Sequence, residues 1–488
     1  MQQRLSRPVA MHAAMLLLTF GLAHAAEPPD SAAFYRQATI ADVEGAIAMF
    51  ELDHPGAAPQ IHDDAFRTSL AEASATARSR AQRVTTIEGH QAVMSAFANA
   101  LGDQHLSFRP ALSVARPSWV GLITAWRDGQ WVVVDEDARP GRAALRGATL
   151  VGCDGRSADA VARERLGGFR ADWSIPAQRG QAAPWLLIDE RNPFIATLKK
   201  CTFRDADGTR EIAMDWQPVA RDSVIHRLRA ATGVGAAGYG VRRLDGGWWV
   251  SINELTARAP AVIADARAHA AQLRAAPFVV FDVRGNGGGA SDIGAQLAAV
   301  LYGEDAVPKD DACPSAWRAS AANLARLESY PAMLGDRLSP EANALIAREI
   351  DAMRAARDAG EAFSRPPRAC PREKATPQRN GPKVLLLTDR TCFSSCLLVT
   401  QLFRELGALH IGEATDGNTH YTENRREPLP SGLGTIGVQA AVDLSMPSRV
   451  GPFEPDIAYA GDLTDTQAVE RWVSSNAERW MSLPRWGR

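Results

Sequence analysis

Two adjacent serines, Ser394 and Ser395, stand between Cys392 and Cys396 in the stretch DRTCFSSCLL. They follow the apolar run KVLLLTD and precede CLLVTQLF, a pattern that indicates a strand, a turn and a helix, with the serines at the turn. The free N–H groups and the positive dipole end at a helix N-terminus stabilise negative charge on a substrate oxygen. A serine at this turn is therefore a candidate nucleophile, and capping of the helix is its alternative role.

A glycine-rich loop follows the buried strand in the stretch FVVFDVRGNGGGASD. Three consecutive glycines let the backbone turn sharply and point its N–H groups at an oxyanion or a phosphate. Neither the spacing GxGxxG nor the pattern GxxxxGK[ST] of a nucleotide site is present, since the loop reads GNGGGA and contains no lysine. The remaining interpretations are an oxyanion loop and a turn without function.

Together with further stretches in the same order, these two motifs resemble the S41 family, the C-terminal processing or tail-specific proteases and their tricorn-core relatives. The resemblance covers residues 85 to 460 and includes GDQHLSF, GALHIGEATDG and PFEPDIAY. The family's stretch of the type T-A-S-A-S-E, laid over residues 391 to 396, implies that the nucleophile is Ser395. Ser394 receives no role in this alignment.

The base that the family most often uses is missing. Many members have a lysine in a G-K-G stretch, where this chain has GEATDGNTH with Asn418 at the lysine position, and no lysine follows Lys383. An asparagine amide cannot take a proton at neutral pH, so catalysis needs another base. The resemblance to tricorn-like relatives implies His105, in DQHLSF, and His420 is the alternative base.

A third group should orient the imidazole. In tricorn-like relatives a glutamate follows the nucleophile by several tens of residues, and Glu454 in GPFEPDI is the matching candidate. A structural turn is the alternative role of this E-P-D stretch. Asp103, two residues before His105, is another group that could hold the imidazole.

The oxyanion hole is expected to combine backbone donors of the glycine loop, Gly287 or Gly288, with the N–H of Cys396, just after the expected nucleophile. Cys396 stands where the family usually has a glutamate. A disulfide between Cys392 and Cys396 would clamp the turn that carries the serines. A cysteine nucleophile would need a reduced thiolate, which an exported chain with an even cysteine count disfavours.

The patterns predict a multi-domain α/β (α+β) fold. A helical domain is expected over 26–115, a β-rich domain that resembles a degenerate PDZ module over 116–220, and the protease core over 221–488, with an inserted lid at about 304–380. In the core, strands such as FVVFDV alternate with helical stretches, which is typical of a sheet covered on both faces. The resemblance implies that this core is of the ClpP/crotonase-like α/β type.

The first 25 residues read as a signal peptide for export. Arg4 and Arg7 precede a short apolar run that ends in small residues, so cleavage is expected after Ala25 and a periplasmic or secreted location follows. The apolar run is too short for a comfortable membrane span, and no stable membrane insertion is expected. A retained N-terminal anchor is the alternative.

Composition limits the partners. The 488 residues are 46% apolar, carry a formal net charge of only -2, and do not cluster their basic residues in runs. Nothing therefore indicates a nucleic-acid groove or a polybasic membrane patch, and protein, peptide or a small molecule is the expected partner.

The six cysteines are an even number, and an oxidising compartment allows them to pair. Their order along the chain suggests three pairs, although six cysteines allow 15 full pairings: Cys153 with Cys201, Cys313 with Cys370, and Cys392 with Cys396. The spacing of cysteines and histidines does not match a zinc site, and no cofactor is expected.

The sequence thus predicts an exported serine endopeptidase in which Ser395 attacks a peptide carbonyl and His105 moves the proton. The PDZ-like region would present the C-terminal end of a substrate. Two alternatives stay open: a protease-fold binding protein that has lost catalysis, and an esterase or amidase that uses the same serine. The distance between His105 and the serine separates the enzyme from the binder.

Overall fold

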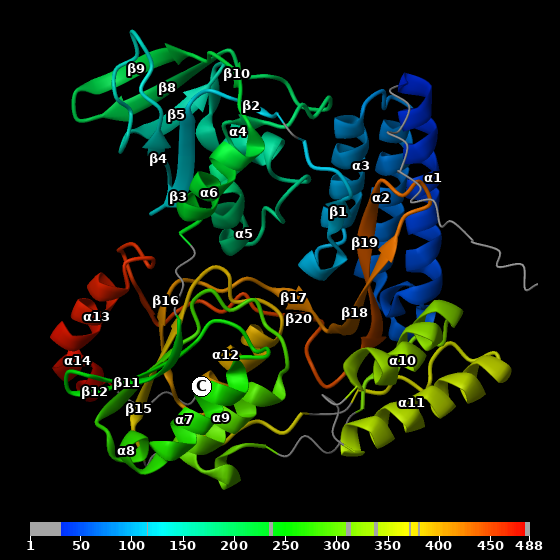
Figure 1. Ribbon diagram of the computed structural model, residues 1–488, viewed down its shortest axis with the longest axis vertical. Helices are drawn as coiled ribbons and strands as arrows, with labels where there is room; N and C mark the ends of the chain where they lie inside the picture. The colour runs from blue at the N-terminus through cyan, green and yellow to red at the C-terminus, as the bar shows by residue number, and fades with distance from the viewer. Residues whose placement is uncertain are drawn as a thin grey trace, which may run out of the picture.

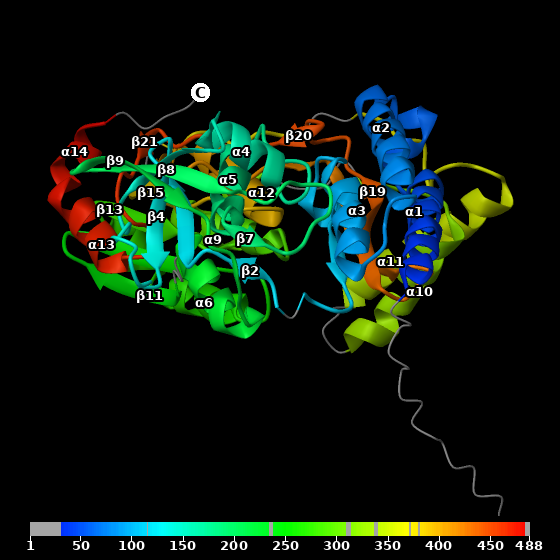
Figure 2. The same ribbon diagram turned by 90° about the horizontal axis from the view of Figure 1, so that it is seen from above.

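The structure is a computed structural model that describes residues 31–114, 116–233, 238–308, 314–335, 340–369, 372–378 and 381–483. Figure 1 shows three parts side by side: a helical unit that begins at α1, a β-rich module above the core, and an α/β core. In both views the first three helices lie to one side of the module and the core, opposite α13 (Thr466–Ser475) and α14 (Ala477–Ser482) (Figures 1 and 2). The signal peptide predicted over 1–25 lies outside the described residues.

Three amphipathic helices form the helical unit, and each begins at a polar residue that caps it. The side chains of Ser31, Asp63 and Thr86 accept a hydrogen bond from the backbone N–H three residues later. Their apolar faces share one core, in which Phe50 and Phe97 are buried. The helices and short 3-10 turns of this unit are α1 Ala32–Asp53, η1 Pro55–Ala57, η2 Pro59–Ile61, α2 Asp64–Ala81, α3 Ile87–Asn99 and η3 Gln104–Leu106.

A hairpin from the C-terminal part of the chain completes the helical unit. Strand β19 (Gly434–Val442) pairs antiparallel with its hairpin partner β18 (Tyr421–Pro428) and with β1 (Phe108–Pro110), with Phe108 opposite Ile436. Gly437 lies against the backbone of His105, because a Cβ built there would stand only 2.0 Å from the His105 carbonyl oxygen. The turn that carries His105 is therefore fixed by a strand that follows the serine motif in sequence.

The insertion expected at 304–380 packs on the same hairpin. Strand β14 (Ala316–Trp317) pairs with β19, and helices α10 (Ala321–Leu334) and α11 (Pro340–Asp358) pack together beside it, below the helical unit in Figure 1. A short 3-10 turn, η5 Glu304–Ala306, precedes them.

The module is built around one antiparallel sheet whose path is β3, β4, β5, β8 and β9, with β6 beside β5. The short helices α4, α5 and α6 pack around it (Figure 1). Its elements are β2 Ser118–Trp119, β3 Leu122–Arg127, β4 Gln130–Glu136, β5 Thr149–Cys153, β6 Arg156–Ser157, α4 Ala158–Arg165, α5 Pro176–Ala182, η4 Ala183–Trp185, β7 Ile188–Asp189, β8 Lys200–Asp205, β9 Gly208–Ala213, β10 Gln217–Pro218 and α6 Arg221–Ala231.

A six-stranded sheet forms the core, in the order β11-β12-β13-β15-β16-β21, with every pair after the first one parallel. The carboxyl ends of β13 and β15 meet at one edge, so the glycine loop and the serine turn that follow them are neighbours. The core elements are β11 Tyr239–Leu244, β12 Gly247–Ile252, α7 Ala259–Ala268, α8 Ala270–Ala275, β13 Phe278–Asp282, α9 Asp292–Tyr302, β15 Lys383–Thr388, α12 Ser395–Glu405, β16 Leu409–Gly412, β17 Asn418–Thr419, β20 Arg449–Val450, β21 Ile457–Ala458, α13 Thr466–Ser475 and α14 Ala477–Ser482.

Helices cover both faces of this sheet, as the continuous apolar strands predict. Phe281 and Phe403 stack at a centroid distance of 4.3 Å on the face covered by α7, α9 and α12. On the other face Trp249 and Val280 pack against Trp480 of α14. The predicted α/β multi-domain fold class is confirmed.

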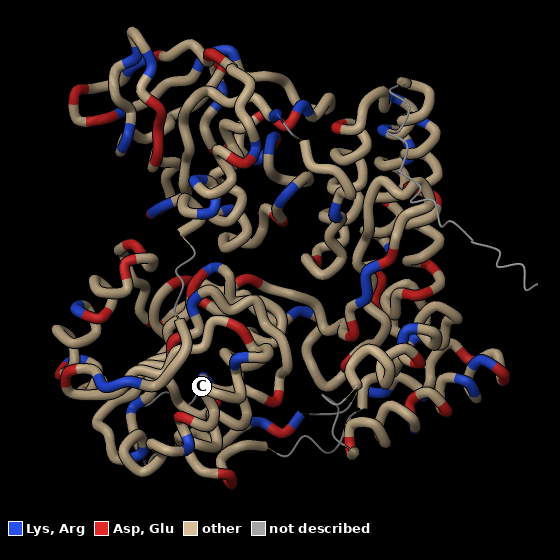
Figure 3. Tube along the Cα trace, in the orientation of Figure 1, with Lys and Arg blue, Asp and Glu red and all other residues tan. Residues whose placement is uncertain are grey.

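Charged residues of both signs are interspersed over all three parts (Figure 3). Among the helices that the structure describes, none has the length and apolar content needed to cross a bilayer.

Two of the three predicted disulfides are present. Cys153 is bonded to Cys201 between β5 and β8, and Cys392 is bonded to Cys396 at the start of α12. Cys313 and Cys370 lie outside the described residues.

The close approach of Gly437 to His105 leads to a stability prediction. Gly437→Ala must push the two backbones apart, and we expect the free energy of unfolding to fall by about 1–3 kcal/mol. Urea unfolding followed by circular dichroism measures the change. Gly89→Ala in α3 is the matched control, because its Cβ would meet only contacts of 3.4 Å or more and alanine favours the helix. An equal fall in the free energy of unfolding in both variants would contradict the prediction.

Candidate active site

The serine turn between β15 and α12 is strained at one residue. Ser394 has φ +57° and ψ -130°, a conformation that residues other than glycine rarely adopt. Although Ser394 stands at the N-cap position, its side chain makes no capping hydrogen bond. Strain of this kind persists where the surroundings hold it, and it presents the serine hydroxyl away from the helix. The capping role considered for Ser394 is therefore not the one found.

His105 faces this serine. Its Nε2 lies 3.0 Å from Ser394 Oγ, and its Nδ1 lies 2.7 Å from Asp103 Oδ1. Because the Asp103 carboxylate can only accept, Nδ1 carries the proton, and Nε2 is left to accept the hydrogen bond from the Ser394 hydroxyl. The Phe393 ring packs on the imidazole at a centroid distance of 4.5 Å. Ser394, His105 and Asp103 thus have the connectivity of a serine–histidine–carboxylate triad.

The carboxylate of Asp103 is buried and held by several donors. Oδ1 also accepts the backbone N–H of His105, and Oδ2 accepts the backbone N–H and the hydroxyl of Thr419. Burial by itself would raise the pKa of Asp103. The hydrogen bond and the charge of His105 lower it, as do the two hydrogen bonds from Thr419, and together they hold the pKa below its usual value. Asp103 is thus ionised and able to stabilise an imidazolium at His105.

The sequence predicts that Ser395 faces His105, but in the structure Ser394 is the serine that does so. Ser395, the expected nucleophile, donates its hydroxyl to the carbonyl oxygen of Gly289 at 2.7 Å. Successive residues at the start of a helix project about 100° apart, so one position along the motif changes the direction of the hydroxyl. The alignment with the family motif identified the turn and was offset by one residue relative to the serine that meets His105.

The other two predicted side chains lie apart from this pair. His420 is buried beside Tyr421, and burial lowers its pKa; among the described contacts, no hydrogen bond joins it to either serine. Glu454 is exposed, and its backbone carbonyl accepts a hydrogen bond from Arg404. Asp103 holds the imidazole where Glu454 was expected to.

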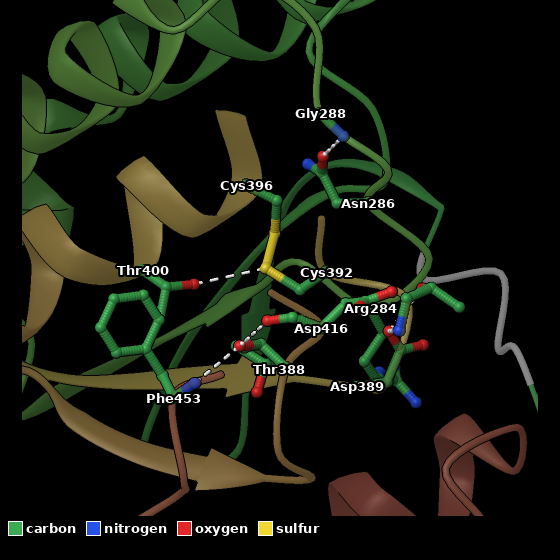
Figure 4. The surroundings of a disulfide bond; sticks show 12 residues. Arg284, Asn286, Gly288, Thr388, Asp389, Cys392, Cys396, Thr400, Asp416 and Phe453 are labelled. Carbon is green, nitrogen blue, oxygen red and sulfur yellow. Dashed lines mark hydrogen bonds between the residues drawn. A yellow bond between two sulfur atoms is a disulfide. The ribbon is translucent and has the colours of Figure 1, made fainter. Parts of the chain in front are cut away.

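The glycine loop lies directly against the serine turn. A Cβ at Gly288 would stand 2.8 Å from Ser394 Cβ, and the residue has φ +101°, so glycine is required there. The N–H of Gly288 donates to Asn286 Oδ1, as Figure 4 shows, and the N–H of Cys396 donates to the carbonyl of Phe393. Two of the expected oxyanion donors, the N–H groups of Gly288 and Cys396, therefore already donate to acceptors within the protein.

Two other amides remain available at this place. Within the described part of the chain, the N–H groups of Gly287 and Ser395 have no protein acceptor. Ser395 follows Ser394 as Cys396 follows Ser395, so its amide has the position, relative to the serine that faces His105, in which the expected donor Cys396 stands relative to Ser395.

The disulfide joins the two ends of the serine turn. Cys392 and Cys396 flank the strained residue, and Cys392 Sγ also lies 3.4 Å from Thr400 Oγ1 in α12 (Figure 4). With both sulfurs bonded to each other, neither is a thiolate. The bridge fixes the turn to the first turns of the helix.

A cavity of about 250 Å³ lies beside the His105 turn, between the helical unit and the module. Asp103, Gln104 and Ser107 line it from one side, and Phe169 and Arg170 from the other. It therefore adjoins the turn that carries His105. Among the described residues, no three His, Cys, Asp or Glu side chains are grouped to hold a metal ion.

Comparison with known proteins identifies the fold by structure alone. No family model and no curated protein matches the sequence. Mature CPAF superposes with a TM-score of 0.59 at 13% identity, over 92% of this chain and 98% of that chain. The complex of mature CPAF with lactacystin superposes with a TM-score of 0.58 at 12% identity, over 92% of this chain and 99% of that chain. The photosystem II D1 C-terminal processing protease aligns at 13% identity over 90% and 98%, with a TM-score of 0.31. The expected S41-type peptidase fold is confirmed.

The buried carboxylate of Asp103 predicts a pH dependence of stability. The pKa of Asp103 is lower in the folded chain than in the unfolded chain. The ionised carboxylate therefore stabilises the fold above the unfolded pKa near 3.8, and this contribution to the free energy of unfolding is lost as the pH falls through the folded pKa. The difference in unfolding free energy between wild type and Asp103→Asn should therefore narrow from pH 7 toward about pH 3. Urea unfolding at a series of pH values measures it.

Thr419→Val checks the cause. This variant keeps the Asp103 carboxylate but removes the hydroxyl that donates to it, so the folded pKa of Asp103 moves up towards the unfolded value, and less stability should be lost between pH 7 and about pH 3 than in wild type. A difference between wild type and Asp103→Asn that stays constant with pH would contradict the prediction.

Proposed function

We propose that this chain is a serine peptidase of S41 type that uses Ser394 as nucleophile and His105 as base. The observation that carries the proposal is the 3.0 Å contact between Ser394 Oγ and His105 Nε2. The S41-type fold and the strained serine turn support it. A histidine within hydrogen-bond reach removes the need for the lysine that Asn418 replaces.

In the proposed reaction Ser394 Oγ attacks the carbonyl carbon of a peptide bond while its proton passes to His105 Nε2. The amides of Gly287 and Ser395 stabilise the tetrahedral oxyanion. His105 then protonates the leaving amine, and an acyl-enzyme forms at Ser394. Water, deprotonated by the same imidazole, hydrolyses the ester and regenerates the serine.

Asp103 has the role of orienting His105 in this proposal. It accepts the Nδ1 proton and stabilises the imidazolium that forms when the serine is deprotonated. Glu454 and His420, the groups first considered for orientation and for the base, take no part.

The proposed substrate is a protein or peptide that reaches the triad between the helical unit and the module. The cavity beside Asp103 and Gln104 supports this route. The two disulfides support a periplasmic or secreted location, since such bonds persist in oxidising compartments. No cofactor is included in the proposal.

The decisive experiment compares two adjacent serines. Ser394→Ala should abolish labelling by a fluorophosphonate probe and hydrolysis of unfolded casein, because the hydroxyl that faces His105 is lost. Ser395→Ala is the matched control, since it removes the adjacent hydroxyl, which bonds only to Gly289 in the structure; labelling should persist. His105→Ala should lower kcat by about a thousandfold or more.

The results separate the alternatives. Labelling that survives Ser394→Ala but not Ser395→Ala would overturn the nucleophile. A wild-type protein that binds unfolded casein without cleaving it and resists the probe would be a binding protein. Labelling together with hydrolysis of a nitrophenyl ester, but of no peptide, would indicate an esterase.

A further inference from the structure

Asp416 is a buried carboxylate that lies behind the proposed triad. It follows β16, is fully buried, and forms no ion pair with any described Lys or Arg. Instead its two oxygens accept four N–H groups. The donors are Gly417 N at 2.7 Å and Gln178 Nε2 at 2.9 Å to Oδ1, and Gln104 Nε2 at 2.8 Å and Gln181 Nε2 at 3.2 Å to Oδ2.

The side chain and the backbone N–H of Asp416 together connect the turns that carry the two reacting side chains. Gln104 directly precedes His105, so its bond to Asp416 holds the histidine turn. The backbone N–H of Asp416 donates to the carbonyl of Cys392 at 3.1 Å, two residues before Ser394. Figure 4 shows Asp416 beside the disulfide of the serine turn.

Helix α5 of the module contacts both turns through the same carboxylate. Gln178 and Gln181, one helical turn apart, both reach Asp416. Gln181 Nε2 also donates to the carbonyl of Arg390, at the start of the serine turn, at 2.6 Å. Three parts of the chain thus meet at one side chain.

We infer that Asp416 is a positioning residue that sets the separation of His105 from Ser394 and locks helix α5 to both turns. The inference rests on the proposed function. Asp416 touches neither reacting atom in the structure, so it acts through Gln104 and through the backbone of Cys392.

The chemistry of the group supports this role. A carboxylate only accepts, so it can gather four donors, whereas an asparagine or glutamine would place a donor of its own among them. Burial of the charge is costly and raises the pKa of Asp416 to about 6, with the neighbouring Asp103 adding to the rise. A neutral residue would pack at lower cost, so packing alone does not account for an acid at this position.

Asp416→Asn tests the inference. If the asparagine oxygen keeps the bonds of Gly417 and Gln178, its amide faces the donors of Gln104 and Gln181, and the histidine turn loses its anchor. We expect kcat for a peptide substrate to fall about tenfold to a hundredfold, with KM little changed, since small misplacements of a reacting group have effects of this size. The thermal midpoint should stay close to that of wild type, because the buried charge is removed as well.

A second substitution should restore the anchor with reversed polarity. In Asp416→Asn combined with Gln104→Glu, the new amide donates to the new carboxylate, and we expect most of the lost kcat to return. Gln104→Glu alone places two carboxylates together and should lower kcat. Asp154→Asn is the matched control, because that carboxylate accepts backbone N–H groups of Lys199 and Lys200 within the module, and its activity should equal that of wild type.

Hydrogen exchange of residues 103–107 provides a readout that needs no activity. Exchange should be faster in Asp416→Asn and return toward the wild-type rate in the double variant. If Asp416→Asn had the kcat and the exchange rates of the wild-type protein, the inference would be overturned. It would also be overturned if Asp416→Asn lost kcat and the double variant did not restore it. An inactive wild-type protein would refute the proposed function, and the exchange rates would still decide the role of Asp416.

Discussion

The antiparallel pairing of β1 with β19 is the contact on which the candidate site depends. His105 and Ser394 are separated by 289 positions, and the two residues belong to different parts of the fold. Strand β19 comes after the serine turn, leaves the core and returns to the helical unit, where it pairs with β1. Gly437 lets the backbone of the His105 turn approach closely. Without this return of the chain, the turn that carries His105 would lack the strand that packs against its backbone.

The core supplies the second requirement, which is a rigid serine turn. Holding a serine at positive φ costs about 1–3 kcal/mol, and the surroundings must offset that cost. The Cys392–Cys396 disulfide closes the turn, Asp416 holds its backbone, and Gly288 packs against Ser394 from the neighbouring loop. The buried carboxylate of Asp389 also accepts the N–H of Gly285, which ties the serine strand to the glycine loop.

Much of this arrangement could be predicted from sequence, because it depends on local patterns. The apolar runs before Gly285 and Asp389 predict buried strands, and both are strands of the parallel sheet. The position of His105 within its motif was enough to select it as a candidate base, and its Nε2 lies 3.0 Å from Ser394 Oγ. The choice between Ser394 and Ser395 was not accessible in this way, because it depends on the φ angle of one residue and on the direction from which the imidazole arrives. The aligned motif pointed to Glu454 as the orienting group, but it does not show which carboxylate reaches the imidazole, and in the structure Asp103 contacts it.

The sequence by itself determined the fold class, the serine turn, the glycine loop and the histidine, because strand and helix periodicity and short motifs are properties of neighbouring residues. The comparison with CPAF shows that the fold persists at 13% identity, where no family model recognises the chain. Only the tertiary structure decided which serine meets His105 and that Asp416 gathers three glutamines. Those contacts join residues far apart in the chain, and their formation depends on how strands pair and helices pack, which no local pattern encodes.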